Sequence, residues 1–271
     1  MNLVNGVEGD AIGVSDRGLA YGDGVFRTFL LRGAKPVLWR RQYAKLAADC
    51  NALRIVCPDT AVFERDLSAI AVRQPDCVVK IIVTRGSGAR GYAIPDAASP
   101  QRVVSAAPLP DYPQRYYDSG VRVRLCRTRL ASQPGLAGIK HLNRLENVLA
   151  RSEWSDPEIA EGLMCDGDGN VVCGTMSNLF LVRGKTLLTP DLTRCGVAGV
   201  MRQLVIDFAR GNDIPVRATR LNMAAVQAAD ELFLVNSVIG VWRVAALADK
   251  TWSGGQLTAR IDRWLSDAQE R

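Results

Sequence analysis

The stretch of residues 108–117 constrains the fold of this chain more than any other feature. It reads Pro-Leu-Pro-Asp-Tyr-Pro-Gln-Arg-Tyr-Tyr and holds three prolines within six positions. Proline lacks a backbone N–H and disfavours helical geometry in the residue before it, so this stretch cannot continue a helix or a central strand. We expect an extended interdomain linker here, between a smaller N-terminal α/β domain at residues 1–107 and a larger C-terminal domain at 118–271.

Strand and helix signals occur on both sides of this stretch. In the first part, the pattern predicts a hairpin, two helices and two buried strands at residues 25–31, 36–39, 40–54, 60–72, 77–84 and 102–107. In the second part, it predicts strands at 121–128, 161–165, 177–183, 186–189, 231–235 and 240–247, and helices at 198–210, 221–228 and 256–268. This mixture of strands and helices indicates an α+β fold in two domains.

The composition is that of a globular protein whose charges are spread along the chain. Of the 271 residues, 48% are hydrophobic and 23% are charged, and the net charge is +6. No apolar run is long enough to span a bilayer and the N-terminus lacks a signal-peptide pattern, so we expect a cytoplasmic protein with no membrane partner. Because the basic residues are scattered, their charge favours attraction of an anionic small molecule over nucleic-acid binding.

The single histidine, His141, narrows the chemistry that is possible. Because there is only one histidine, we expect neither a histidine-based zinc site nor a Ser-His-Asp triad, and acid–base chemistry would have to come from Lys, Asp, Glu, Tyr or a cofactor. The seven cysteines have no metal-type spacing, so we expect reduced, buried thiols and no metal.

Residues 86–91 form a G-x-G-x-x-G pattern directly after a predicted strand. A dinucleotide-binding turn of this kind requires a helix that opens at its third glycine. Pro95 and Pro100 follow too closely for such a helix, so the pattern does not indicate a Rossmann domain. We interpret the segment as a mobile loop whose Arg85 and Arg90 suit a carboxylate, or alternatively as a solvated glycine-rich turn.

Lys140 is the strongest candidate for a catalytic residue. It follows a glycine-containing approach at 135–138 and precedes apolar residues at 142, 145, 148 and 149, a spacing that predicts a helix. A lysine at such a loop-to-helix junction can be held partly desolvated, which lowers the pKa of its ammonium and allows the neutral amine to form a Schiff base. The alternative is a solvated surface lysine.

Two further segments have the character of anion-binding turns. Residues 196–202 place two glycines at the start of a predicted helix, where backbone N–H groups and the helix dipole attract an anion. Asn236 and Ser237 leave a predicted strand and could donate to the same group. Combined with a candidate Schiff-base lysine, two such turns suggest a phosphorylated aldehyde cofactor, pyridoxal 5'-phosphate.

Four segments, in order along the chain, resemble the fold-type-IV pyridoxal-phosphate family, which includes the branched-chain and D-amino-acid aminotransferases. They are residues 15–28, 138–146, 174–180 and 189–202. The resemblance implies a two-domain fold like that of D-amino-acid aminotransferase and a homodimer, with Lys140 as the Schiff-base lysine. It also implies that the phosphate is held by the N–H groups of Val200 and Met201 together with Asn236 and Ser237.

Within this family, two motifs are most similar to the aminodeoxychorismate lyase branch. They are Lys-His-Leu-Asn-Arg-Leu-Glu at 140–146 and Arg-Gly-Ser-Gly-Ala-Arg-Gly-Tyr at 85–92. The resemblance implies a carbon–oxygen lyase of folate synthesis that converts 4-amino-4-deoxychorismate to 4-aminobenzoate and pyruvate. We expect Arg90 to bind a substrate carboxylate, with Tyr92 and Thr28 lining the site. The alternative is an aminotransferase of D- or branched-chain amino acids.

The chain departs from the family pattern at two positions. Cys173 stands where the family has a glutamate paired with the pyridine nitrogen, and a cysteine is a poor counter-ion unless its surroundings lower its pKa. We therefore expect a less electron-withdrawing cofactor ring, which an elimination driven by aromatisation tolerates better than transamination does. Lys45 stands where the family has a phosphate-binding arginine, so it either binds phosphate as a point charge or is a solvated helix residue.

Overall fold

The computed structural model describes residues 1–270, and these divide into two compact units. The first unit comprises Met1–Asp111 and Ile139–Asn143, and the second comprises Tyr112–Gly138 and Arg144–Glu270. The short segment that carries Lys140 therefore belongs to the smaller unit, although the predicted limits assigned it to the larger domain. No helix among residues 1–270 is long and apolar enough to cross a membrane.

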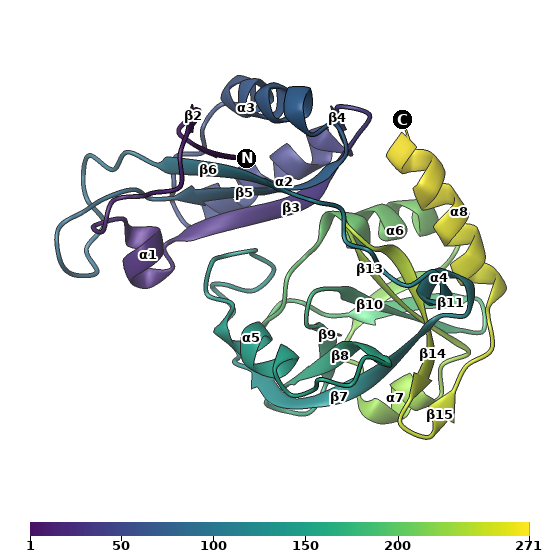
Figure 1. Ribbon diagram of the computed structural model, residues 1–271. Helices are drawn as coiled ribbons and strands as arrows, with labels where there is room; N and C mark the ends of the chain where they lie inside the picture. The colour runs from purple at the N-terminus through teal and green to yellow at the C-terminus, as the bar shows by residue number, and fades with distance from the viewer. Residues whose placement is uncertain (271) are drawn as a thin grey trace. The chain divides into compact units, whose positions relative to one another are not determined.

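The first unit is built on an antiparallel sheet of six strands in the order β2-β1-β6-β5-β3-β4 (Figure 1). The strands are β1 (Asn2–Val4), β2 (Val7–Glu8), β3 (Gly24–Arg32), β4 (Lys35–Pro36), β5 (Cys77–Thr84) and β6 (Gln101–Ala107). Strand β5 pairs with β3 along the whole length of β5, from Thr84 opposite Gly24 to Cys77 opposite Leu31. The predicted hairpin is present with a second strand of only two residues, and both predicted strands at 77–84 and 102–107 are present. Burial is confirmed for alternate residues of β5 but only for Val104 in β6. The first hairpin, β1–β2, was not predicted.

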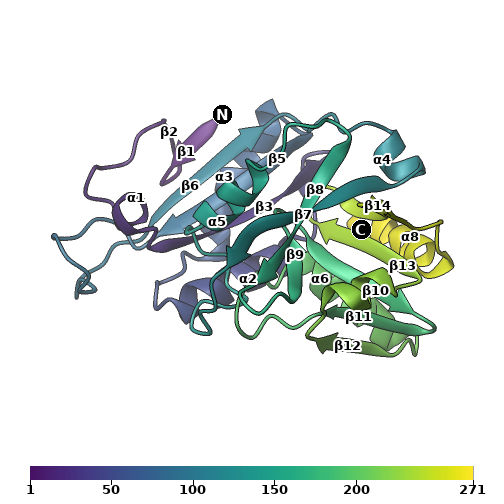
Figure 2. The ribbon, with the colours of Figure 1, turned by 90° about the horizontal axis from the view of Figure 1, so that it is seen from below.

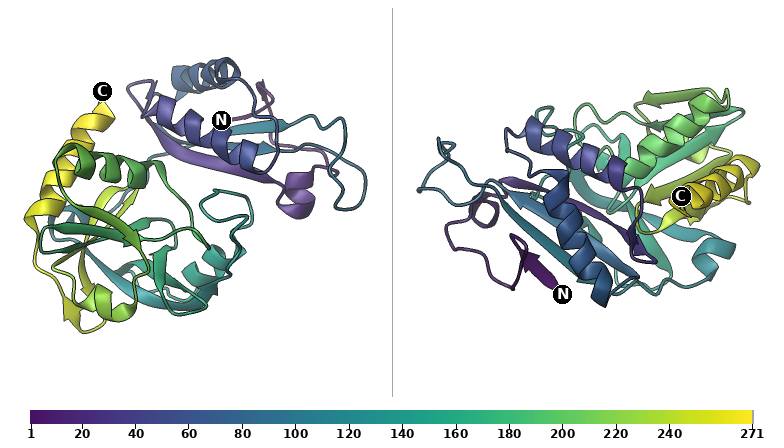
Figure 3. Two further views of the ribbon diagram at one scale, coloured as in Figure 1. Left: turned by 180° about the vertical axis from the view of Figure 1, so that it is seen from behind. Right: turned by 90° about the horizontal axis from the view of Figure 1, so that it is seen from above.

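Two helices, α2 (Trp39–Ala52) and α3 (Thr60–Arg73), cover one face of this sheet (Figures 1 and 3). Both were predicted from their periodicity, and α1 (Arg17–Tyr21) was not. The core beneath the helices contains alternate strand residues such as Phe29, Val79 and Ile81 together with Leu46 of α2 and Phe63 of α3, all of which are fully buried. Alternation of this kind is expected where one face of a sheet packs on helices.

The second unit is built on a nine-stranded sheet in the order β12-β11-β10-β13-β14-β7-β8-β9, with β15 paired to β14. The strands are β7 (Val121–Leu130), β8 (Ile159–Asp166), β9 (Val171–Gly174), β10 (Asn178–Arg183), β11 (Thr186–Pro190), β12 (Val216–Thr219), β13 (Glu231–Asn236), β14 (Gly240–Leu247) and β15 (Lys250–Thr251). Strands β7, β8 and β9 are neighbours at one end of this sheet (Figure 2). Strand β7 is parallel to β8, and β8 is antiparallel to β9.

Five helices belong to the second unit: α4 (Arg115–Asp118), α5 (Leu145–Arg151), α6 (Val200–Gly211), α7 (Met223–Gln227) and α8 (Gln256–Glu270). Helices α6 and α8 lie side by side, with the rings of Phe208 and Trp264 5.0 Å apart (Figure 3). The three helices predicted at 198–210, 221–228 and 256–268 correspond to α6, α7 and α8.

The proline-rich stretch differs from the predicted extended linker in its second half. Residues 115–118 form the short helix α4. The rings of Tyr112 and Tyr116 pack edge-on against Trp242, with centroids 4.8 and 5.2 Å away. Burial of two aromatic rings against the core of the second unit outweighs the preference for extended backbone that the prolines impose up to residue 113.

Candidate active site

Lys140 does not begin a helix; its segment adds to the edge of strand β3. The N–H of Phe26 donates to the carbonyl of Lys140 at 2.9 Å, and the N–H of Leu142 donates to Gly24 at 3.0 Å. The apolar spacing that predicted a helix from residue 142 belongs to α5, which starts only at Leu145 and exposes 68% of that side chain. The predicted helix after Lys140 is therefore present but begins only at Leu145, because the backbone of residues 140–142 pairs with the open edge of β3 instead.

The amine of Lys140 lies over an aromatic ring. Its Nζ is 4.4 Å from the centroid of the Phe26 ring, a geometry in which the ring face attracts an ammonium. Lys140 is half-buried, and Thr28 lies two residues beyond Phe26 on the same face of β3. The structure therefore places the amine of Lys140 and the side chain of Thr28, two of the predicted site residues, on the same face of the sheet.

Asp49 of α2 fixes the backbone of Lys140 from the helical side of the sheet. Its carboxylate is only 2% exposed and accepts the Lys140 N–H at 3.2 Å. The same carboxylate forms ion pairs with Arg27 of β3 and with Lys45, one turn earlier on α2. Burial lowers the pKa of Lys45, and the charge of Asp49 opposes this effect. Lys45 is thus a member of a buried charge cluster, and its predicted role at a phosphate stays a prediction.

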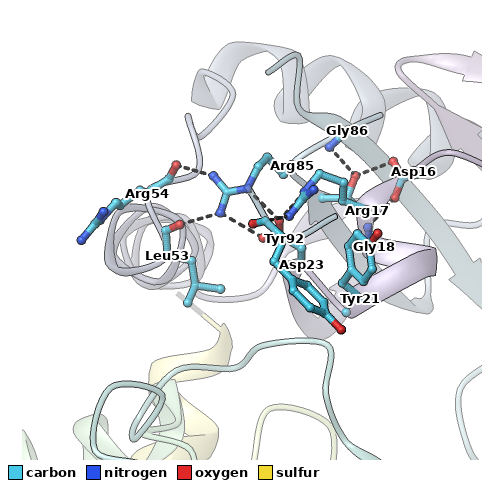
Figure 4. A network of polar contacts seen from close by, with 12 residues as sticks. Asp16, Arg17, Gly18, Tyr21, Asp23, Leu53, Arg54, Arg85, Gly86 and Tyr92 are labelled. Atoms are coloured by element: carbon cyan, nitrogen blue, oxygen red, sulfur yellow. Dashed lines mark hydrogen bonds and ion pairs between the residues drawn. The ribbon is translucent and has the colours of Figure 1, made fainter. Parts of the chain in front are cut away.

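Arg85 is a structural residue, which corrects the expectation that it suits a carboxylate ligand. It is 4% exposed and makes a two-bond ion pair with Asp23, at 2.8 and 2.9 Å (Figure 4). It also donates to the carbonyls of Leu53 and Arg54 at 2.7 and 2.6 Å. Burial alone would raise the pKa of Asp23, but hydrogen bonds and charge from Arg85 and Arg17 outweigh it and lower that pKa.

The other two residues predicted on this loop, Arg90 and Tyr92, have exposed side chains, with Tyr92 86% exposed. The loop is fastened to α1 beside them, since Arg17 donates to the Gly91 carbonyl at 3.0 Å and Tyr21 packs its ring 5.4 Å from that of Tyr92. This part of the loop is therefore held by specific contacts, and the substrate-binding roles of Arg90 and Tyr92 stay predictions.

In the second unit, the side chain of Asn178 clamps the segment that leads into α6. Its Nδ2 donates to the Val197 carbonyl at 2.8 Å, and its Oδ1 accepts the N–H of Gly199, the N-cap residue, at 3.2 Å. A Cβ at Gly199 would lie 2.4 Å from that oxygen, so any larger residue would displace the Asn178 side chain from the clamp. Val200 and Met201 are the first two residues of α6, where N–H groups point out of the helix and suit an anion.

Gly138 pairs with the same segment. Its N–H donates to the Gly196 carbonyl at 3.0 Å, and its carbonyl accepts the Ala198 N–H at 3.1 Å. The chain immediately before residue 139 is thereby tied to the glycine-containing entrance of α6, within the second unit.

Asn236 and Ser237 lie where β13 turns into β14. The Oδ1 of Asn236 accepts the N–H groups of Val238 and Ile239, both at 2.8 Å, and its Nδ2 donates to the Met176 carbonyl at 3.1 Å. Most of the hydrogen-bonding groups of the Asn236 side chain are thus used to hold this turn. Contact of Asn236 and Ser237 with a phosphate stays a prediction.

Cys173 lies on β9, opposite Met164 of β8, and is 6% exposed. Burial raises the pKa of its thiol, and the nearby negative charge of Glu161 raises it further. The surroundings of Cys173 therefore favour the neutral thiol, so this residue supplies no negative charge.

Glu161 is a buried residue that the sequence analysis did not identify as functional, and it fixes the turn after Cys173. Its carboxylate, 1% exposed, accepts the N–H groups of Gly162, Thr175 and Met176 and the hydroxyls of Thr175 and Ser177, at 2.5 to 3.1 Å. A single acidic residue at the start of an apolar run was the signal that could have drawn attention to it.

A family model described as amino-transferase class IV matches residues 24–247. The chain belongs to the class IV aminotransferase family. An aminodeoxychorismate lyase of Vibrio harveyi is 32% identical to it over 249 residues, which cover 92% of each chain.

Solved structures of this family share the fold. A crystal structure of 4-amino-4-deoxychorismate lyase from Pseudomonas aeruginosa is 49% identical, covers 98% of both chains and has a TM-score of 0.94. The branched-chain amino acid aminotransferase of Escherichia coli is 20% identical over 99% of this chain and 94% of its own, with a TM-score of 0.83, and shows the fold alone. The predicted fold-type-IV architecture is confirmed.

Proposed function

We propose that this protein is a pyridoxal-phosphate-dependent lyase that converts 4-amino-4-deoxychorismate to 4-aminobenzoate and pyruvate. The observation that carries the proposal is likeness over nearly the whole chain to proteins with this name, at 32% and 49% identity. We further propose that it acts as a cytoplasmic homodimer on a small anionic substrate. Its two domains would then follow the predicted division at residues 108–117, except that Ile139–Asn143 belongs with the N-terminal domain.

The residues at the start of α6 fit the phosphate of such a cofactor. Asn178 holds the entrance of the helix in place, and Gly199 leaves no side chain over its first turn. The N–H groups of Val200 and Met201 would hold the phosphate, with Asn236, Ser237 and Lys45 as further donors. Pyridoxal phosphate, when bound, supplies a carbonyl carbon that an amine can attack and a ring that accepts an electron pair.

Lys140 has the chemistry to hold the cofactor and to move a proton at its Nζ. The Lys140 N–H donates to Asp49 and the Lys140 carbonyl accepts from Phe26, which fixes the main chain and limits the positions that its amine can occupy. In the proposed reaction, Lys140 Nζ takes the proton from the amine-bearing ring carbon of the substrate. Loss of the neighbouring enolpyruvyl group then gives an aromatic product. Thr28, Arg90 and Tyr92 are the proposed substrate contacts.

The alternative is transamination of D- or branched-chain amino acids, a reaction of other members of the family. The neutral thiol of Cys173 argues against it, because no negative charge at this position would keep a ring nitrogen protonated. Elimination is favoured because aromatisation of the product drives it, so it depends less on electron withdrawal by the cofactor ring.

The test is a comparison of wild type, Lys140→Ala and the surface variant Lys35→Ala. We expect wild type and Lys35→Ala, loaded with pyridoxal phosphate, to absorb visible light and to form 4-aminobenzoate. Lys140→Ala should lose turnover by about 10²- to 10⁴-fold, the range for removal of a proton-transferring side chain. Full turnover in Lys140→Ala would refute the role of the lysine. Keto-acid formation from D-alanine or leucine, without 4-aminobenzoate formation, would instead support the aminotransferase.

A further inference from the structure

One face of the six-stranded sheet carries a lysine that the proposed function does not use. Lys80 lies on β5, between β6 and β3. Its side chain is exposed, whereas its neighbours Val79 and Ile81 are fully buried in the core beneath α2 and α3. Because successive side chains of a strand point to opposite faces, Lys80 lies on the face opposite those helices.

Hydroxyl groups flank Lys80 on both neighbouring strands. Its direct cross-strand partners are Thr28 on β3 and Ser105 on β6, and both are half-buried. Side chains directly opposite one another on adjacent strands lie close enough to bind one group together. The Ser105 hydroxyl donates to the Lys80 carbonyl at 3.4 Å, a long hydrogen bond that a charged acceptor can replace. One ammonium with a hydroxyl on each side forms a donor set that suits a carboxylate.

The ring of Phe26 connects Lys80 to Lys140. The Nζ of Lys80 is 5.2 Å from the ring centroid and the Nζ of Lys140 is 4.4 Å from it, so the two nitrogens lie within 9.6 Å, the sum of these distances. A small molecule can span this interval, with its reacting amine near Lys140 and a carboxylate at Lys80. The proposed substrate has this form, since it carries an amine and a carboxylate at opposite positions of one ring and a second carboxylate on its enolpyruvyl group.

We propose that Lys80, together with the hydroxyls of Thr28 and Ser105, binds a carboxylate of the substrate. This inference rests on the proposed function and adds a substrate-binding residue that the sequence motifs did not indicate.

The test compares wild type with Lys80→Met, Lys80→Arg and the control Lys35→Met, which removes the same charge from an exposed lysine on β4. Loss of one charge-assisted hydrogen bond to the substrate should raise the KM of Lys80→Met by about 10- to 100-fold and leave kcat nearly unchanged. Lys80→Arg should recover most of the loss, and Lys35→Met should behave as wild type. The thermal midpoint and the visible absorbance of bound cofactor should be unchanged in all three variants.

Product inhibition identifies which carboxylate is bound. 4-Aminobenzoate retains the ring carboxylate, and pyruvate retains the carboxylate of the enolpyruvyl group. The product whose carboxylate Lys80 binds should inhibit Lys80→Met more weakly than wild type, by a factor similar to the rise in KM. An unchanged KM, unchanged inhibition by both products, or an equal rise of KM in Lys35→Met would overturn the role of Lys80 alone. A wild type that binds the cofactor but forms no 4-aminobenzoate would refute the proposed function and, with it, this inference.

Discussion

The substitution Asn178→Asp in the clamp should weaken cofactor binding much more than it changes the stability of the fold. Aspartate has nearly the same shape, keeps the acceptor for the Gly199 N–H at 3.2 Å and loses the donor to the Val197 carbonyl at 2.8 Å. The lost hydrogen bond costs about 0.5–1.5 kcal/mol, and a negative charge at the N-terminus of α6 returns about 0.3–1 kcal/mol. We therefore expect the free energy of unfolding to change by no more than about 1 kcal/mol.

The effect on a bound phosphate is larger. A phosphate held by the N–H groups of Val200 and Met201 would lie roughly 7 Å from the new carboxylate, because two hydrogen bonds of about 3 Å, not in line with each other, and the backbone between their N–H groups separate them. At an effective dielectric constant of about 20, two unit charges at this distance repel by about 2.4 kcal/mol. The dissociation constant of pyridoxal phosphate should then rise by about 50-fold.

The assay is a titration of the apoprotein with pyridoxal phosphate and, separately, with pyridoxal, which lacks the phosphate. Asn178→Asp should weaken the first and leave the second within about threefold of wild type, because the repulsion acts only on the phosphate. Asn222→Asp is the matched control, since Asn222 caps the N-terminus of α7 through the Ala225 N–H. Equal weakening of both ligands, or an equal effect of Asn222→Asp, would refute this account of the clamp.

Two further predictions follow from the buried groups. Arg85→Lys should lower the free energy of unfolding by about 2–4 kcal/mol, because lysine cannot replace the forked contacts to Asp23, Leu53 and Arg54. The control Arg90→Lys, at an exposed side chain, should change it by less than about 0.5 kcal/mol. Urea unfolding of both variants measures this, and equal effects would contradict the structural role of Arg85. Because the raised pKa of Cys173 keeps its thiol protonated, Cys173→Ala should leave the pH dependence of kcat/KM unchanged between about pH 7 and 9. A titration step seen in wild type and absent from the variant would show that a thiolate forms.

The long elements could be predicted because their burial patterns are local. Helix α2 buries Leu46 and Cys50 at helical spacing, and β5 buries alternate residues from Cys77 to Val83, so periodicity sufficed for both. The short elements β2, β15 and α4 have two to four residues each, too few to establish a period.

The site was predictable only in part, since its residues depend on contacts between distant parts of the sequence. The segment of Lys140 has the apolar spacing of a helix, but it lies at the edge of β3 because that edge is open beside Gly24 and Phe26. Asp49 is one of several polar residues on α2, and nothing in its own neighbourhood shows that its carboxylate reaches a backbone N–H 91 positions away. Asn178 belonged to a recognised motif, but its function as a clamp depends on residues 197–199.

If Cys173 stands where the family resemblance implies a glutamate, the position of the nearby negative charge matters for the reaction. Glu161 lies on the neighbouring strand, close enough for its charge to raise the pKa of Cys173. Three donors occupy one of its carboxylate oxygens and two occupy the other, so its hydrogen-bonding capacity is used in holding the turn after Cys173. A ring nitrogen bound in this region would therefore meet a neutral thiol. We infer that the site is suited to an elimination whose driving force is formation of an aromatic product, since such a reaction needs the least help from a protonated ring.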